Sequence, residues 1–540
     1  MQWKWADSTP YHSICFAIYP LVHLLARNSE HVTLGLVLQL SAFFFGITSL
    51  LWLVFRTIAH MRPQAAAIAT SAALLCLFSY YPLVLALSDW DLVPVQTRLY
   101  MYLWPLPVIV LCAIVVWLKR TRHELSVLTT FLNLAAIVLV CLSVSDLLLR
   151  VVEAARVEGC VSCTGSKTDP RLVDSRRRIA PRDHEMLPDI YYIVLDAYAR
   201  SDVLKEVYQY DNSRFLKQLA DRGFFIADGS FSNYAQTFLS LSSTLNFCYL
   251  EARQPCGERG RLCMNQVIAK IDQCELLRIL KRLDYRFIAF PSGIVGTEFR
   301  GADQYVSPLV APTFLQYYVM RMTTLSPLVD ALFPALINYS HRNLVLHNFE
   351  KLASIKREGP PIFAFCHIMS PHPPFVFNER GEPVDQRDSE ITFSDGSHFH
   401  YMEKARQEHY VEGYRRQIPF TEKKTIEMVD SITSNSDRPL VIILQADHGP
   451  GSLLDWYNTS NVHFRERMGI LNAYYVPERC RRFLHSNISP VNTFRILLRC
   501  CLGIDMDLLP DKSYFSSWQH PLQFIDVTEK VRLQRSTGAP

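Results

Sequence analysis

Five long apolar runs follow one another at the start of the chain. They cover residues 11–26, 32–55, 65–87, 100–118 and 125–149. Most of them reach the roughly 20 residues that an α-helix needs to cross a bilayer. The first is shorter and contains His12, Pro20 and His23, so a cleaved signal peptide is its alternative. Because no small-residue cleavage site follows it and four more runs do, we expect residues 1–150 to form a transmembrane bundle of about five helices.

The charges in the short connections between these runs orient the predicted bundle. If the N-terminus is cytoplasmic, the cytoplasmic segments carry Lys4, Arg56, Arg62, Lys119, Arg120 and Arg122, and the outer loops carry only Arg27 and Arg98. Lysine and arginine are enriched in cytoplasmic loops, which favours this orientation. An odd number of spans then places everything after Leu149 outside the cytoplasm. The pattern indicates a multi-pass protein of a bacterial inner (cytoplasmic) membrane, with its large domain in the periplasm or outside the cell.

The segment 151–187 is polar and basic, with three arginines in a row at positions 176–178 and no clear apolar period. We interpret it as a linker along the outer membrane face, where arginines meet anionic headgroups. A solvated connector is the alternative. A second unusual segment, 309–346, is apolar and aromatic. It is either a buried helical excursion or a segment that rests on the bilayer beside the active site.

From residue 188 onward the pattern changes to that of an α/β domain, which we assign to residues 188–540. Short apolar runs rich in β-forming residues alternate with helical segments. The candidate strands are 188–196, 287–290, 361–366, 440–445 and 471–476. Ser213 to Arg222 has the apolar spacing of an amphipathic helix, which Gly223 ends. Such alternation predicts a mostly parallel sheet with helices on both faces, and a ligand site beyond the carboxyl ends of its strands.

The net charge says little about binding partners, whereas the cysteines bear on the cellular compartment. The formal net charge of +4 gives no case for nucleic acid binding. Of the 14 cysteines, those after the apolar runs are expected in an oxidising compartment, where disulfides persist. We predict two local disulfides among Cys248, Cys256, Cys263 and Cys274, because no histidine lies among them to suggest a metal site. Cys160 and Cys163 are expected to form a local disulfide, with a zinc or redox role as the alternative.

Two of the predicted strands end in carboxylates. The first ends at Asp196, and the strand 440–445 leads into Asp447-His448-Gly449. The carboxyl ends of parallel strands meet at one edge of a sheet, so these side chains are expected to lie close together. A hard oxygen and an imidazole at such an edge suit a divalent cation. The sequence therefore predicts one divalent metal ion, zinc or manganese, with magnesium as a further option.

A hydroxyl-rich stretch, residues 232–246, has the pattern of a loop that enters a helix. A helix N-terminus offers free N–H groups to an oxyanion, so a hydroxyl there is well placed to attack phosphorus or sulfur. Coordination to a divalent cation lowers the pKa of such a hydroxyl. The alternative is that the serines and threonines only cap and pack the helix.

Three histidines follow predicted strands. His367 and His372 lie five residues apart in a proline-rich loop. They are candidates to bind an anionic oxygen or to protonate a leaving group. His463, beyond the Asp447-His448 turn, is a weaker candidate of the same kind.

The ordered series Asp196, Thr237, His372 and Asp447-His448 resembles the alkaline phosphatase and sulfatase superfamily. With five apolar runs ahead of it, the chain most resembles the membrane-bound branch, which includes lipoteichoic acid synthases, phosphoethanolamine transferases and phosphoglycerol transferases. The resemblance implies that Asp196, Thr237, Asp447 and His448 hold the metal, that Thr237 is the nucleophile, and that His372 lies near the transferred phosphate.

The chain also departs from these families. The transferases usually have glutamate where this chain has Asp196, and the spacing from His448 to His463 differs from that of a tight second metal site. The Cys/Ser-x-Pro-x-Arg sequence that yields a formylglycine nucleophile is absent around Thr237, which argues against arylsulfatase activity.

The resemblance implies a phosphotransferase. It would move a phospholipid headgroup, phosphoethanolamine or phosphoglycerol, through a phosphothreonine onto a glycan or lipid of the cell envelope. Its partners would be the membrane, a phospholipid donor and a glycan or lipid acceptor. A phosphodiesterase or other hydrolase using the same site is one alternative. An inactive membrane scaffold is the other, and the joint presence of the four metal-site residues argues against it.

Overall fold

The structure is a computed structural model, and its residues fall into two compact units. It describes residues 9–27, 34–89, 105–156, 159, 161–164, 186–253, 260–308, 323–324, 336–384, 395–397, 404–434 and 438–533. The helical unit comprises Met1–Val157 and Pro312–Ala335, and the α/β unit comprises Glu158–Ala311 and Leu336–Pro540.

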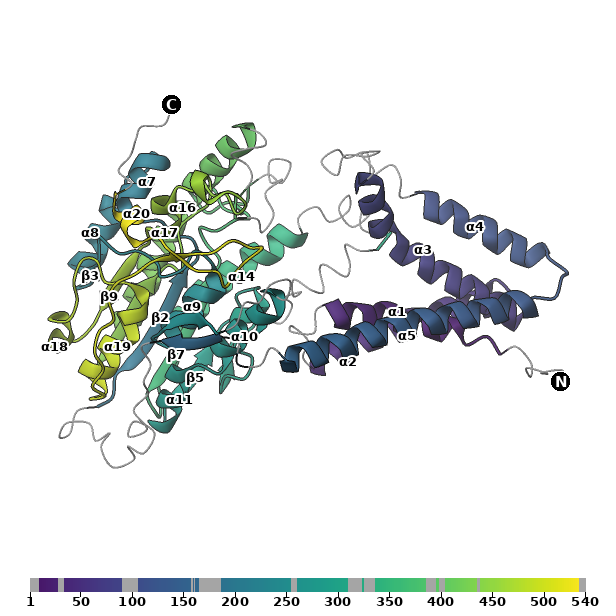
Figure 1. Ribbon diagram of the computed structural model, residues 1–540, viewed down its shortest axis with the longest axis horizontal. Helices are drawn as coiled ribbons and strands as arrows, with labels where there is room; N and C mark the ends of the chain where they lie inside the picture. The colour runs from purple at the N-terminus through teal and green to yellow at the C-terminus, as the bar shows by residue number, and fades with distance from the viewer. Residues whose placement is uncertain are drawn as a thin grey trace. The chain divides into compact units, whose positions relative to one another are not determined.

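The helical unit is built from long apolar helices (Figure 1). They are α1 (His12–Arg27), α2 (Leu34–Leu53), α3 (Pro63–Asp89), α4 (Pro105–Arg120) and α5 (Ser126–Arg156), and α2 continues as a π-helical turn, η2 (Val54–Ile58). Helix α1 packs mainly against α5 and also contacts α3 and α2. Phe16, Leu74 and Ala136 form one apolar cluster that joins α1, α3 and α5.

Two stretches of the described residues are long and apolar enough to cross a membrane. They are Val37–Ile58 in α2 and η2, and Ser126–Leu149 in α5. The apolar stretches His12–Ala26 in α1 and Pro63–Phe78 in α3 are shorter. The prediction of apolar helices at the start of the chain is confirmed, and the number of five membrane spans stays a prediction.

The α/β unit contains a seven-stranded sheet of order β3-β9-β8-β2-β7-β5-β6. Its strands are β2 (Asp189–Leu195), β3 (Phe225–Ile226), β5 (Arg286–Ala289), β6 (Gln304–Tyr305), β7 (Ile362–Ile368), β8 (Leu440–Gln445) and β9 (Asn472–Tyr475). The central pairs β8-β2, β2-β7, β7-β5 and β5-β6 are parallel, whereas β9 runs antiparallel to both of its neighbours. The sheet is therefore mixed but mostly parallel, as the alternating pattern predicts.

Both faces of this sheet are buried, and β2 shows why. Tyr191, Ile193 and Leu195 point into one apolar core, and the intervening residues of β2 point into the other. The first core is completed by α7 (Ser201–Val207), α8 (Ser213–Asp221), α14 (Leu336–Ala353) and α16 (Lys404–Ser434). The second is completed by α9 (Thr237–Leu245), α10 (Gly260–Asp272), α11 (Glu275–Arg282) and α19 (Pro490–Cys501). The result is the helix–sheet–helix layering visible in Figure 1.

Shorter elements complete the α/β unit. The helices are α17 (Phe464–Met468), α18 (Glu478–Arg481) and α20 (Thr528–Leu533), and the short 3₁₀-helices are η6 (Val295–Thr297) and η8 (Thr459–Asn461). Two two-stranded sheets pair β1 (Val161–Thr164) with β4 (Tyr249–Ala252) and β10 (Tyr514–Phe515) with β11 (Ile525–Asp526).

The prediction of local disulfides is wrong for three cysteines. Cys163 is bonded to Cys248, 85 residues away in sequence, and not to Cys160. The reason is the antiparallel pairing of β1 with β4, which places Cys163 opposite Leu250 and close to Cys248. Cys274 is a buried thiol outside any disulfide. Cys263 is disulfide-bonded, whereas Cys160 and Cys256 lie outside the described residues.

Most of the predicted linker (165–185) and most of the apolar segment 309–346 lie outside the described residues. Residues 312–335 belong to the helical unit, where the backbone N–H of Thr324 donates to the Leu77 carbonyl of α3 at 2.7 Å. From residue 336 the chain forms α14 of the α/β unit.

Candidate active site

The side chains predicted to bind a metal gather at the carboxyl edge of three adjacent strands. Asp196 follows β2, Asp447 and His448 follow β8, and the loop that carries His372 follows β7. Because β2 lies between β8 and β7 in a parallel arrangement, these three strand ends are neighbours. Asp196, Asp447 and His448 are all buried, and each offers a ligand atom within 4.8 Å of the other two.

Two carboxylate oxygens at this edge have no hydrogen-bond partner. They are Oδ1 of Asp196 and Oδ2 of Asp447, and both are buried. Nε2 of His448 lies 3.9 Å from the first and 3.4 Å from the second. A buried carboxylate oxygen without a partner costs free energy unless a cation or a donor compensates it. The two oxygens and the imidazole therefore fit a divalent metal ion.

Thr237 is brought to the same place by helix α9. It is the first residue of that helix, and its Oγ1 lies 3.1 Å from Nε2 of His448. Nδ1 of His448 lies 2.9 Å from the Gly449 carbonyl oxygen, which directs Nε2 toward the site. A Cβ at Gly449 would lie 2.0 Å from the Glu466 carbonyl oxygen, so the turn requires glycine.

The two histidines of the β7 segment have different surroundings. His367 is buried, and its Nε2 lies 2.9 Å from Oδ2 of Asp196 while Nδ1 lies 3.1 Å from Thr297 Oγ1. His367 thus bonds to Oδ2 of Asp196 and leaves Oδ1 of Asp196 without a hydrogen-bond partner. The backbone N–H of His372 donates to the Asp196 carbonyl, and its ring centroid lies 6.4 Å from that of His448. His372 therefore lies beside the metal-site residues, and it is its backbone, not its ring, that bonds to Asp196.

The electrostatics of the site keep Asp196 ionised and His448 neutral. Burial alone raises the pKa of Asp196, but His372, His367 and His448 outweigh burial and hold that pKa well below its usual range. Burial and the neighbouring Arg467 guanidinium lower the pKa of His448. Neutral imidazole and ionised carboxylate are the forms that bind a metal. His367 differs: burial lowers its pKa, but the hydrogen bond to Asp196 outweighs burial and raises it.

Arg467 is a site residue that the sequence did not reveal. It is buried, and its Nε donates to the Ala235 carbonyl at 2.9 Å while Nη1 donates to the Gly449 carbonyl at 3.1 Å. It thus joins the segment before Thr237 to the turn after His448. Its partners are mainly backbone carbonyls, which leave no mark in a sequence. Asp395 faces Nη2 of Arg467 at 3.4 Å and accepts from Trp456.

His341 is a second residue that sequence reasoning missed. It lies on α14 and is buried, and burial together with the nearby His372 lowers its pKa to about 4. No neighbouring motif marks it in the sequence. His463, by contrast, was singled out, and its Nδ1 accepts from the Glu466 N–H at 3.1 Å as the cap of α17.

The strand order and the site at the carboxyl edge are those of an alkaline phosphatase-like hydrolase or transferase. The sulfatase family model matches residues 188–468, more than half of the chain. The chain belongs to the sulfatase family. The resemblance to the alkaline phosphatase and sulfatase superfamily is therefore confirmed, as is the expectation of a sulfatase-like enzyme.

Several solved structures are similar in fold. One is the C-terminal periplasmic domain of EcEptC from Escherichia coli in complex with zinc, at 9% identity and a TM-score of 0.41, covering 64% of this chain and 94% of that chain. Another is the lipooligosaccharide phosphoethanolamine transferase A (EptA) from Neisseria meningitidis, an integral membrane protein, at 12% identity and a TM-score of 0.38, covering 91% and 95%. A third is the phosphonate monoester hydrolase of Agrobacterium radiobacter, at 12% and 0.37, covering 61% and 80%. No curated sequence relative matches.

A half-buried carboxyl group contacts the segment that follows Asp196. Glu422 of α16 accepts from the Tyr198 hydroxyl at 2.6 Å and from the Tyr210 hydroxyl at 2.8 Å. Burial outweighs these two hydrogen bonds and raises the pKa of Glu422 to about 7. Tyr198 is two residues from Asp196, so the state of Glu422 bears on the stability of this part of the fold.

We predict a pH dependence of stability from Glu422. Between about pH 4.5 and pH 7 the folded state holds a proton that the unfolded state releases, so the free energy of unfolding falls as pH rises through this window. Glu422→Gln keeps an acceptor but cannot ionise. Its melting temperature should fall by a few degrees less than that of the wild type between pH 5 and pH 8. Differential scanning fluorimetry of the full chain in detergent measures this, and equal slopes would contradict the assignment.

Proposed function

We propose that the chain is a membrane-anchored, metal-dependent phosphotransferase that moves a phospholipid headgroup through a phosphothreonine at Thr237. The observation that supports this most is the convergence of three features at one point. Two buried carboxylate oxygens lack partners, a neutral imidazole lies within 4 Å of both, and a helix-terminal hydroxyl lies 3.1 Å from that imidazole. A purely structural role for these residues does not explain why all three features occur at one point.

We propose that the metal ion is held by Asp196, Asp447, His448 and Thr237. Carboxylate and hydroxyl oxygens with one histidine suit zinc or manganese, and magnesium also accepts such oxygen ligands. A bound divalent ion lowers the pKa of a coordinated hydroxyl and neutralises charge on the transferred phosphoryl oxygens. His367 holds the second oxygen of Asp196 and so fixes the direction of the first.

The residues divide the first chemical step between them. Thr237 gives up its hydroxyl proton to solvent, its Oγ1 forms a bond to phosphorus, and the bond between phosphorus and the diacylglycerol oxygen breaks. His372 in its protonated form is proposed to donate a proton to that oxygen, so that diacylglycerol leaves neutral. The N-terminus of α9 presents backbone N–H groups to the phosphoryl oxygens of the resulting phosphothreonine.

The second step reverses these roles with a new acceptor. A hydroxyl of a cell-envelope glycan or lipid attacks phosphorus and gives its proton to His372. The bond between phosphorus and Oγ1 of Thr237 breaks, and Oγ1 regains a proton from solvent. If water attacks in place of that acceptor, the same site is a phosphodiesterase. The two outcomes differ in whether the released headgroup depends on an added acceptor.

The helical unit is the proposed membrane anchor. Large apolar side chains are exposed along its two longest apolar stretches, among them Leu50 and Trp52 on α2 and Phe131 and Leu142 on α5. A soluble protein rarely exposes such a continuous apolar surface, whereas a bilayer covers it. The disulfides Cys163–Cys248 and Cys480–Cys500 support an extracytoplasmic position for the α/β unit, because they persist in oxidising compartments.

Thr237→Ala is predicted to reduce diacylglycerol release from mixed phospholipids by at least about 10³-fold, because it removes the attacking group. The measurement is diacylglycerol formation by the purified full chain in detergent. Ser240→Ala, one turn along the same helix, is the matched control and should remain active. Full activity of Thr237→Ala with loss in Ser240→Ala would move the nucleophile to Ser240.

Asp447→Asn is predicted to lower bound metal by about tenfold or more, since it removes the charge of a proposed ligand while keeping its shape. Metal per protein is measured by mass spectrometry after gel filtration. Asp189→Asn is the control, because Asp189 is buried at the other end of β2. Wild-type metal content in Asp447→Asn would contradict the proposed site.

The proposed orientation predicts that added proteinase K degrades the α/β unit in spheroplasts of a Gram-negative bacterium that expresses the full chain. A cytoplasmic marker protein should stay intact in the same sample. Protection of the α/β unit until the spheroplasts are lysed would place it in the cytoplasm and refute the topology.

A further inference from the structure

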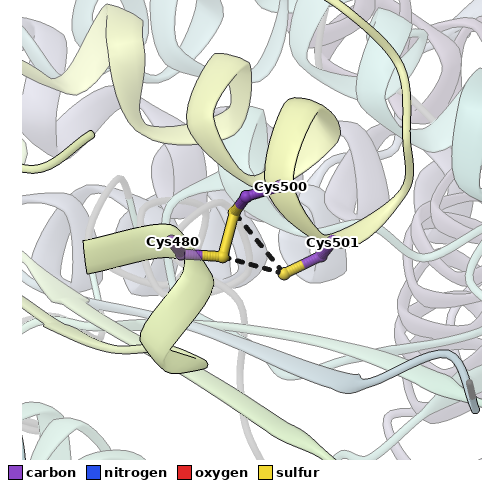
Figure 2. A group of neighbouring side chains, drawn as sticks. All are labelled: Cys480, Cys500 and Cys501. Carbon is purple, nitrogen blue, oxygen red and sulfur yellow. Dashed lines mark hydrogen bonds between the residues drawn. A yellow bond between two sulfur atoms is a disulfide. The ribbon is translucent and has the colours of Figure 1, made fainter. Parts of the chain in front are cut away.

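Three cysteines meet where α18 and the end of α19 come together. Cys480 of α18 is bonded to Cys500 of α19. The sulfur of Cys501, the next residue, lies 3.4 Å from that of Cys480 and 3.7 Å from that of Cys500 (Figure 2). A third sulfur is therefore in contact with both atoms of a disulfide. Sequence reasoning did not single out this group.

This cluster lies away from the proposed active site. Strand β9 leads into α18 and is antiparallel to β8, so Tyr475 at its end pairs with Ile442 near the start of β8. Asp447 follows the opposite end of β8. The cysteines consequently lie toward the amino edge of the parallel strands, and the metal-site residues lie at the carboxyl edge.

The surroundings of the cluster are rich in arginine. Nε of Arg479 donates to the Cys500 carbonyl at 2.8 Å. The guanidinium groups of Arg482 and Arg499 both lie over the ring of Phe483, at 4.8 and 5.0 Å from its centroid. The thiolate is the species that attacks a disulfide. Cys500 and Cys501 are both half-buried, so the thiolate also has access to solvent.

We propose that Cys480, Cys500 and Cys501 form a thiol–disulfide exchange site in which Cys480 pairs with either of its two neighbours. The thiolate of Cys501 attacks the sulfur of Cys480 and a Cys480–Cys501 bond forms. The Cys480–Cys500 bond breaks, and Cys500 leaves as the thiolate. No external oxidant or reductant is consumed, because one disulfide and one thiol are present before and after.

The exchange has a structural consequence that a single disulfide would not have. The covalent link between α18 and α19 survives whichever of the two adjacent residues is alkylated or oxidised. At any time one of the pair keeps a thiol, which makes this edge of the α/β unit a modification site for thiol-reactive compounds. The proposal is independent of the phosphotransferase chemistry.

Differential labelling of the wild-type full chain tests the exchange directly. The protein is denatured in guanidinium with excess N-ethylmaleimide, then reduced and treated with an isotope-labelled maleimide. Trypsin cuts after Arg499, so one peptide begins at Cys500 and holds both adjacent cysteines. Fragmentation between them should show the first label on Cys500 in some molecules and on Cys501 in others. First label on Cys501 alone would overturn the proposal.

Three variants make the test independent of labelling artefacts. Cys501→Ser cannot exchange, so any first label on Cys500 in this variant measures scrambling during denaturation. Cys500→Ser is expected to form a Cys480–Cys501 disulfide and to keep the melting temperature of Cys501→Ser. Cys480→Ser should carry the first label on both adjacent residues and melt at a lower temperature. Two thiols at Cys480 and Cys501 in a folded Cys500→Ser protein would also overturn it.

Discussion

The burial of two carboxylates at one edge of the sheet is the constraint on which the rest of the site depends. Oδ1 of Asp196 and Oδ2 of Asp447 are removed from water and have no hydrogen-bond partner. Such groups destabilise a fold unless positive charge compensates them. His367 and the neighbouring histidines compensate part of the charge of Asp196, and they leave one oxygen of each acid available. A divalent cation is the simplest group that would bind both oxygens and also account for the position of the Thr237 hydroxyl beside His448.

The same constraint accounts for the contacts that Arg467 and Gly449 make around the site. Arg467 cannot sit among the ligands without repelling a metal, and it instead bonds to the carbonyls of Ala235 and Gly449. In doing so it joins the segment that carries Thr237 to the turn that carries His448. Gly449 allows the Glu466 carbonyl to approach that turn closely. The segment that carries Thr237 and the metal-site turn are thus held together by one buried side chain that bonds to the backbone of both.

The parts of this arrangement that follow from local sequence could be predicted. The buried strands β2, β7 and β8 are continuous apolar runs, and the residues after them are acids and histidines, so the edge of the sheet and its chemistry were accessible. The parts that depend on contacts between segments far apart in sequence could not be predicted. The Cys163–Cys248 disulfide requires β1 to lie beside β4, and the nearness of His341 to His372 requires α14 to lie beside the loop after β7. Arg467 binds backbone oxygens, which every residue has, and its function therefore left no pattern. The prediction that His367 lies in the loop after the strand is wrong, because β7 extends to Ile368 and holds His367 buried against Asp196.

Intact mass of the full chain after incubation with mixed phospholipids tests the central claim most directly. The account predicts a mass increase that maps to Thr237 and equals phosphoethanolamine or phosphoglycerol, and it predicts that Thr237→Ala lacks this adduct. An adduct on another residue, or headgroup turnover by the metal-loaded wild type without any adduct on Thr237 under rapid acid quenching, would contradict the proposed covalent mechanism.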